Sequence, residues 1–162
     1  MALTKQKLTP MQALEKLKHY CSYQERSHAE VVQQLYAYSV YKGDHDAIIA
    51  SLIEKNYLNQ ERFAIALVGG KHRAKSWGRI KIMNALKAKG VTSTYILKEA
   101  FKQIDEVAYL KKLQNFADKK WATLKGEQYL IKKKKLYTHL LQKGYESKLV
   151  LKEIERLEGS KK

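Results

Sequence analysis

Apolar residues recur every three or four positions along most of the chain, in segments separated by short polar breaks. In the first segment Ala13, Leu17 and Tyr20 stand four and three residues apart, which is the spacing of one helical face. The only proline, Pro10, stands where the first helix is expected to begin. Most glycines fall between the segments and do not form the paired turns of hairpins. The pattern predicts helix almost throughout and therefore an all-α fold.

Polar residues that commonly cap helices precede several of these segments. Ser27 is followed three residues later by Glu30, which is the spacing of a capping box. Other helices are expected to begin at Asp44, Asn59, Ser76, Ser93 and Asp105.

The same order of three helices occurs three times, with a period of about 50 residues. The clearest internal match pairs LKAKGV (residues 86–91) with LLQKGY (140–145), and LYAYSV (35–40) is a weaker third copy. The expected units are residues 9–56, 57–104 and 105–158. Each unit is too small to bury its apolar faces alone, so neighbouring units should stack into an elongated, curved array. The alternative is a single helical bundle in which the glycine spacing is accidental.

The charge of the chain is large and unevenly distributed. The formal net charge is +16, from 32 Lys and Arg against 16 Asp and Glu. Residues 1–60 have a net charge of +1, residues 61–104 of +8 and residues 105–162 of +7. Such a surface attracts nucleic acid, an anionic membrane or an acidic protein.

Two basic clusters are the candidate contact residues. The first surrounds a tryptophan, which can stack on a base while the cations pair with phosphates; it comprises Lys71, Arg73, Lys75, Trp77, Arg79 and Lys81. The second is the run Lys132, Lys133, Lys134 and Lys135. Four consecutive positions span more than one helical turn, so at least one of these lysines should lie at the edge of the buried face. For both clusters the alternative is a solvated basic surface.

No catalytic, cofactor-binding or metal-binding motif is complete. Gly69, Gly70 and Lys71 resemble part of a phosphate loop, but Ile65 and His72 stand where that motif needs glycine and Ser or Thr. The histidines do not occur at zinc-ligand spacing, and the H-x-E fragment at His28 lacks the Pro-Cys-x-x-Cys of deaminases. The sequence therefore predicts a protein that is not an enzyme.

The sequence also predicts a cytoplasmic protein. Residues 1–10 lack the apolar region of a signal peptide, and nowhere do 18 apolar residues run together. The single cysteine, Cys21, cannot form an internal disulfide, which fits a reducing compartment.

Three short motifs are similar to those of a known family. QERS (residues 24–27) resembles an R-E-R-S-type motif, and YLNQERFA (57–64) resembles G-Y-L-[DN]-D-x-R-F-A without its glycine. KSWGRI (75–80) followed by LKAKGV (86–91) resembles K-x-x-G-x-x-x-I…L…K-G-[IV]. With these motifs the chain resembles, over roughly residues 11–157, the regulatory protein RecX family of bacterial RecA modulators. Asn56 replaces the usual glycine, which Asn can do because it tolerates the left-handed conformation. Asn59 and Gln60 replace an acidic pair but keep a helix cap.

The resemblance implies a regulator of recombination and DNA repair that lies along the RecA–DNA filament. It would contact RecA and, without sequence specificity, DNA, and would inhibit RecA's ATPase and strand exchange. A monomer is expected because an array with capped ends needs no partner copy. The motif residues expected to connect one unit to the next are Arg26, Tyr57, Leu58, Arg62, Phe63 and Ala64, and Ser27 belongs to the same set of motifs. Gly78, Gly90 and Gly144 are expected to permit tight turns.

Two other functions fit the residues less well. The last two helices of each unit could form a helix-turn-helix that binds DNA or RNA directly. No such helix is rich in Arg, Asn or Gln, so this binding would be largely non-specific. Membrane-surface binding through the lysine-rich helix is disfavoured because Leu130, Ile131 and Leu136 are expected in the core.

Overall fold

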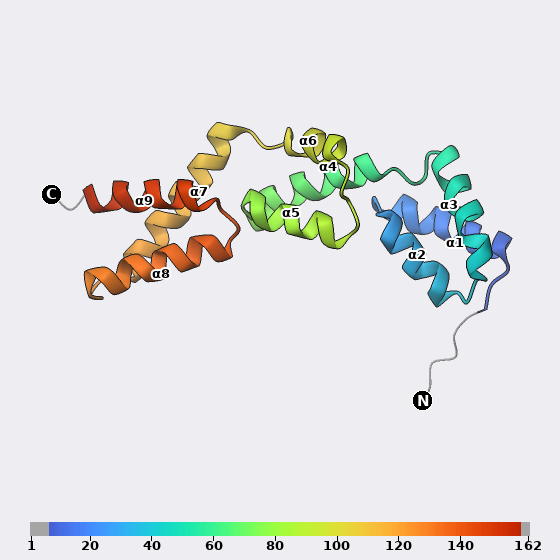
Figure 1. Ribbon diagram of the computed structural model, residues 1–162, viewed down its shortest axis with the longest axis horizontal. Coiled ribbons are helices and arrows are strands. Elements are labelled where there is room, and N and C mark those ends of the chain that lie inside the picture. Colours follow the sequence, from blue (N-terminus) through green and yellow to red (C-terminus); the bar gives the residue numbers. More distant parts are fainter. Residues whose placement is uncertain (1–6, 160–162) are drawn as a thin grey trace, which may run out of the picture. The chain divides into compact units, whose positions relative to one another are not determined.

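The computed structural model describes residues 7–159, and this part of the chain is helical without strands (Figure 1). The all-α prediction is therefore confirmed. Its α-helices are α1 (Pro10–Tyr23), α2 (His28–Ala37), α3 (His45–Glu54), α4 (Gln60–Gly70), α5 (Arg79–Ala88), α6 (Thr94–Phe101), α7 (Glu106–Thr123), α8 (Tyr129–Gln142) and α9 (Ser147–Gly159). A 3-10 turn, Lys42–Asp44, precedes α3, and a π-helical turn, Lys71–Lys75, follows α4.

The helices divide into two compact units. The first contains the described residues up to Ala66 together with Leu86–Ala100. The second contains Leu67–Ala85 together with the described residues from Phe101 onward. Helices α1–α3 thus lie in the first unit and α7–α9 in the second, whereas α4, α5 and α6 are each divided between them. The division into repeats at residues 56/57 and 104/105 stays a prediction.

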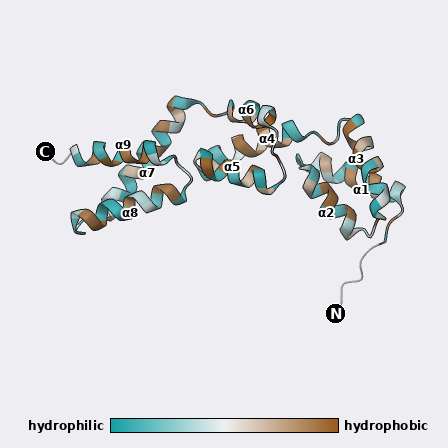
Figure 2. Ribbon diagram, viewed as in Figure 1, coloured by the Kyte–Doolittle hydropathy of each residue, from teal (hydrophilic) through white to brown (hydrophobic). Residues whose placement is uncertain are grey.

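Equivalent helices bury side chains at the same four-residue spacing. In α1 the buried residues are Ala13, Leu17 and Cys21, and in α7 they are Tyr109, Leu113 and Ala117. This spacing places one stripe of each helix against its neighbours, whereas the remaining positions include most of the polar residues, as the mixed colours of each helix show (Figure 2).

The second helix of each predicted unit also buries residues at four-residue spacing, but the residue type at the first buried position varies. The buried pairs are Val31 and Leu35 in α2, Ile82 and Leu86 in α5, and Leu136 and Leu140 in α8. Four residues before each pair stands another buried residue, namely Ser27, Gly78 or Lys132. The apolar stripe is thus kept three times, but its N-terminal position differs in chemistry each time.

The turn after each of these helices is also repeated. The backbone N–H groups of Val40, Val91 and Tyr145 donate to the carbonyls of Leu35, Leu86 and Leu140 at 3.1, 3.0 and 3.3 Å. The residue before each donor is left-handed, with φ of 56° at Ser39, 80° at Gly90 and 96° at Gly144. All three copies of the internal sequence match therefore have the same helix-ending turn.

Four of the six predicted caps are confirmed. Ser27 and Glu30 form a capping box, and Asn59, Ser93 and Asp105 accept bonds from backbone N–H groups three residues later. The capping bond predicted at Asp44 is wrong, because its side chain caps nothing, although α3 does begin directly after it at His45. The prediction for Ser76 is wrong too, because Ser76 is left-handed at φ 55° after the π-helical turn and α5 begins only at Arg79.

Candidate partner and nucleic-acid interface

Trp77 organises the first basic cluster. The ammonium groups of Lys71 and Lys81 lie 4.8 and 4.6 Å from the centre of its half-buried ring. The π-helical turn supplies Lys71, and α5 supplies Lys81. Trp77 therefore holds two cations together from separate elements by cation–π attraction.

Two other cations of this cluster are more exposed than Lys71 and Lys81. Lys75 and Arg73 are exposed on the π-helical turn. The guanidinium of Arg73 lies beside Gly69, where an added Cβ would come within 2.9 Å of its Nη1. A larger residue at Gly69 would displace Arg73.

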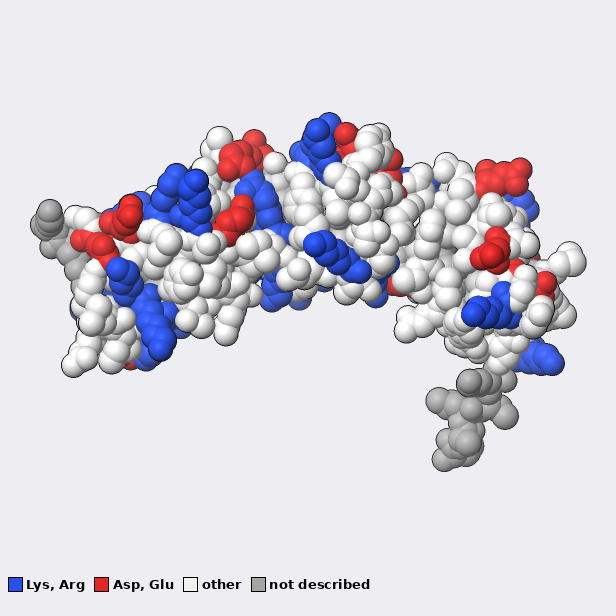
Figure 3. Space-filling model, viewed as in Figure 1, with Lys and Arg blue, Asp and Glu red and all other residues white. Residues whose placement is uncertain are grey.

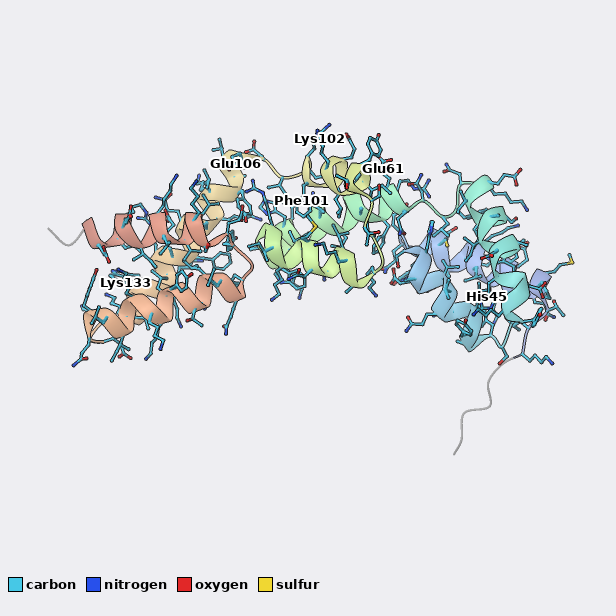
Figure 4. The ribbon with its side chains drawn as sticks, in the orientation of Figure 1. His45, Glu61, Phe101, Lys102, Glu106 and Lys133 are labelled. Carbon is cyan, nitrogen blue, oxygen red and sulfur yellow. The ribbon has the colours of Figure 1, made fainter. Side chains whose placement is uncertain are left out.

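The partly exposed side chain of Arg79 is bound by other residues of the protein. One guanidinium nitrogen donates to Glu146 at 2.8 Å and the other to Glu106, near the start of α7 (Figure 4). The guanidinium also lies 3.9 Å from the centre of the Tyr109 ring. Because two carboxylates balance its charge, Arg79 contributes less to the outward field than the sequence alone suggested.

Tyr109 is the buried partner of Arg79. Its hydroxyl accepts the backbone N–H of Arg79 at 2.9 Å and donates to the carboxylate of Glu146. Burial and the bond to Glu146 raise the pKa of Tyr109, so the phenol stays protonated and remains a donor. Tyr145, also buried, donates to the Ser76 carbonyl at 2.9 Å, and burial raises its pKa to about 12.

Gly78 lies against the backbone that follows α8. Its N–H donates to the Lys143 carbonyl at 2.7 Å, and an added Cβ would lie 2.3 Å from the carbonyl carbon and oxygen of Gly144. Among the glycines, positive φ occurs at Gly90, Gly126 and Gly144. The tight turn expected at Gly78 is instead a close backbone approach, which needs glycine for lack of space.

In the first unit, Arg62 links α4 to the segment between α1 and α2. Its Nε donates to both carboxylate oxygens of Glu25 at 3.1 and 3.2 Å, and its other nitrogens donate to the side chain and carbonyl of Asn56 at 2.8 and 2.9 Å. Asn56 has φ of 65°, the left-handed conformation expected where it replaces glycine.

The other motif residues of this unit are local or buried. Arg26 donates to the Tyr20 carbonyl at 3.0 Å and stacks on the Tyr20 ring, so its contacts stay beside α1. Tyr57 is partly buried against the α1–α3 core, and Leu58, Phe63 and Ala64 are buried.

The four lysines of α8 have four different environments. Lys132 is only 8% exposed, and its Nζ lies 3.9 Å from the centre of the Trp121 ring. Lys133, labelled in Figure 4, lies 3.3 Å from Glu158, and Lys135 lies 2.6 Å from Glu127. Lys134 is exposed and has no ion-pair partner in the described part of the chain. The prediction that one lysine lies on the buried side of the helix is confirmed at Lys132.

The core assignment of two residues beside these lysines is wrong. Leu130 and Ile131 are 75% and 43% exposed, whereas Leu136 is fully buried. The buried stripe of α8 runs through positions 132, 136 and 140, so positions 130 and 131 fall on other faces.

A basic groove between α7 and α8 brings two of the predicted contact residues, Lys134 and Lys135, together with residues outside the predicted clusters. It has a volume of about 490 Å³ and is lined by Lys120, Ile131, Lys134, Lys135, Thr138, His139 and Gln142. Desolvation, and then the charges of Lys120 and Lys143, lower the pKa of His139. In Figure 3 several Lys and Arg side chains gather over the α7–α9 part of the visible face. The available sequence signal was the three- and four-residue spacing of polar positions along α8.

Clusters suited to a metal ion and helices able to span a membrane are both absent from the described residues. Residues 7–159 contain no cluster of His, Cys, Asp or Glu suited to a metal ion. Within the same range, no helix is long and apolar enough to cross a membrane.

Comparisons with known proteins agree with one another. The family description "RecX, second three-helix domain" matches residues 59–98. The chain is 30% identical over 149 residues to regulatory protein RecX of Prosthecochloris aestuarii, covering 90% of this chain and 93% of the relative. It is 32% identical over 101 residues to regulatory protein RecX of Pelodictyon phaeoclathratiforme, covering 62% and 61% of the two chains.

Solved structures share the fold. The crystal structure of RecX from Lactobacillus salivarius superimposes with a TM-score of 0.80 at 23% identity, over 92% of this chain and 96% of that one. Another RecX crystal structure gives 0.78 at 18% identity, over 86% and 70%. From its identity to a RecX protein along nearly the full length of both chains, we conclude that this chain belongs to the regulatory protein RecX family.

Proposed function

We propose that this protein binds the RecA–DNA filament and inhibits the ATPase and strand-exchange activities of RecA without being an enzyme. The observation that carries the proposal is the 30% identity to a regulatory protein RecX over 93% of that relative. The same proposal includes a cytoplasmic, monomeric protein.

The charge distribution supports this function. A RecA–DNA filament offers DNA phosphates, and residues 61–162 hold almost all of the net charge of +16. Arg73 and Lys75 are exposed and available for contact, whereas Arg79 is bound to Glu146 and Glu106. Lys75 is therefore the better position for testing contact in this cluster.

The test measures DNA-dependent ATP hydrolysis by RecA, pre-assembled on single-stranded DNA, across a titration of this protein. We expect hydrolysis and strand exchange to slow at substoichiometric amounts. The Lys75→Glu variant should inhibit RecA less than the wild type does, and it should have the same thermal stability. An unchanged rate over the full titration would refute the proposal.

Direct, largely non-specific binding of nucleic acid is a second candidate function. The groove between α7 and α8 favours it, because its charged lining residues are all basic.

A further inference from the structure

Every charged residue that lines the groove between α7 and α8 is basic. The groove-facing positions on α8 are 131, 134, 135, 138, 139 and 142, which recur every three or four residues on one face of the helix. At a rise of 1.5 Å per residue this face is about 16 Å long. Lys120 on α7 forms part of the opposite wall. The groove is thus a short basic depression that is open to solvent, formed mainly by α8 where it packs against α7.

The positive charge of the groove is only partly neutralised by the protein. Lys135 pairs with Glu127, which lies before α8. Lys120 and Lys134 have no ion-pair partner among the described residues. The lowered pKa of His139 is the expected response of an imidazole that is partly desolvated next to uncompensated cations. The groove therefore keeps a positive charge that no carboxylate of the described residues neutralises.

The lining chemistry favours phosphate groups. The cations that line the groove are lysines, which bind phosphate oxygens as point charges. Thr138 and Gln142 add neutral hydrogen-bond donors further along the same face. The lining includes no Trp, Tyr or Phe on which a base could stack. Contacts spaced by helical turns suit a ligand with repeated anionic groups.

We propose that this groove binds the phosphodiester backbone of nucleic acid directly, through Lys120, Lys134 and His139. The inference deepens the proposed function, because it assigns a DNA contact to a filament-binding protein. It places that contact on α7 and α8, on residues that do not belong to the Trp77 cluster. It also requires no sequence preference, because phosphates carry no base identity.

The test uses the full chain and a fluorescein-labelled oligo(dT) strand, with affinity measured by anisotropy over a range of salt concentrations and without RecA. The combined variant Lys120→Ala/Lys134→Ala should bind roughly 10- to 30-fold more weakly at 0.1 M salt, with a log–log salt slope shallower by about 1.4. The matched control Lys111→Ala/Lys152→Ala removes the same charge from the groove between α7 and α9 and should keep the wild-type slope. Circular dichroism confirms that each variant is folded.

A second readout is the titration of His139, followed by NMR with and without the oligonucleotide. A bound phosphate should raise the pKa of His139, because it supplies the missing counter-charge. Equal weakening by the two variants would overturn the assignment, as would an unchanged His139 or equally tight binding of polyglutamate through the same lysines. Wild-type protein that does not bind free oligo(dT) would overturn it as well.

Inhibition of RecA by the same variants is measured separately. A wild type that binds oligo(dT) through the groove but does not inhibit RecA contradicts only the proposed function. A wild type that inhibits RecA but does not bind through the groove contradicts only this inference.

Discussion

Gly78 and Gly144 touch through their backbones: an added Cβ on Gly78 would lie 2.3 Å from the carbonyl carbon and oxygen of Gly144. The two residues are held together by the N–H of Gly78, which donates to Lys143, and by the N–H of Ile80, which donates to Gly144 at 2.9 Å. This contact brings the start of α5 to the turn between α8 and α9, and Arg79 then reaches Glu146.

The first prediction concerns this backbone contact. Gly78→Ala should lower the free energy of unfolding by about 1–3 kcal/mol, because the methyl group must displace backbone atoms. Gly70→Ala is the matched control: Gly70 lies at the end of α4, and a Cβ there meets nothing within 4 Å. It should be neutral or stabilising by up to about 1 kcal/mol. Urea unfolding measures both, and equal effects would contradict the close-contact explanation.

The second prediction concerns the hydroxyl of Tyr109. Tyr109→Phe keeps the buried ring but leaves the Arg79 N–H and the Glu146 carboxylate without that partner, so it should cost about 1–3 kcal/mol. Tyr23→Phe, at a side chain that is 84% exposed, should change stability by less than about 0.5 kcal/mol. The measurement is the midpoint of chemical denaturation, compared between variants whose unfolding free energy depends equally on denaturant concentration. A Tyr109→Phe protein as stable as the wild type would show that the buried bonds contribute nothing net.

The third prediction concerns acid sensitivity at His72. His72 is buried, its Nδ1 has no hydrogen-bond partner, and burial followed by the charges of Lys112, Arg79 and Arg73 lowers its pKa. Below pH 6.5 the unfolded chain takes up a proton at this residue that the folded protein resists, so stability should fall as the pH drops toward the folded pKa. His72→Leu cannot be protonated and should lose less stability between pH 7.5 and 5.5. His28 and His139 have lowered pKa values too, so part of the loss remains. A variant that loses as much stability as the wild type would exclude His72 as a cause.

The fourth prediction concerns the link made by Arg62. Arg62→Lys keeps the charge but cannot reach Glu25 and both Asn56 oxygens at once, so it should cost about 1–2 kcal/mol. The ion pair itself contributes little of this, because both side chains are about one-third exposed. Arg73→Lys at an exposed position is the control. Differential scanning calorimetry should show a lower melting temperature for the first variant only.

Features that depend on neighbouring residues were largely predictable. The helix-ending turns after Leu35, Leu86 and Leu140 follow from local sequence, and so does the left-handed Asn56. The start predicted at Ser76 was wrong because the π-helical turn shifts the beginning of α5 to Arg79. Asp44 stands directly before α3, but its side chain makes no capping bond.

The availability of each candidate contact residue could not be predicted in the same way. Arg79 and Lys75 look alike in the sequence, yet Arg79 is bound by a carboxylate 67 residues away while Lys75 is exposed. Lys132 and Lys134 are near neighbours, yet one is buried against Trp121 and the other lines a groove.

The amino-acid sequence by itself determined the net charge, the presence of the helices and most of the apolar residues in their buried stripes, because these depend on residue type and on spacings within a few turns. Only the tertiary structure decided which charges face outward, why Gly78 must be glycine and where a basic groove forms. These depend on distant segments that meet in the fold, and local periodicity holds no information about which carboxylate or backbone will lie opposite a given side chain.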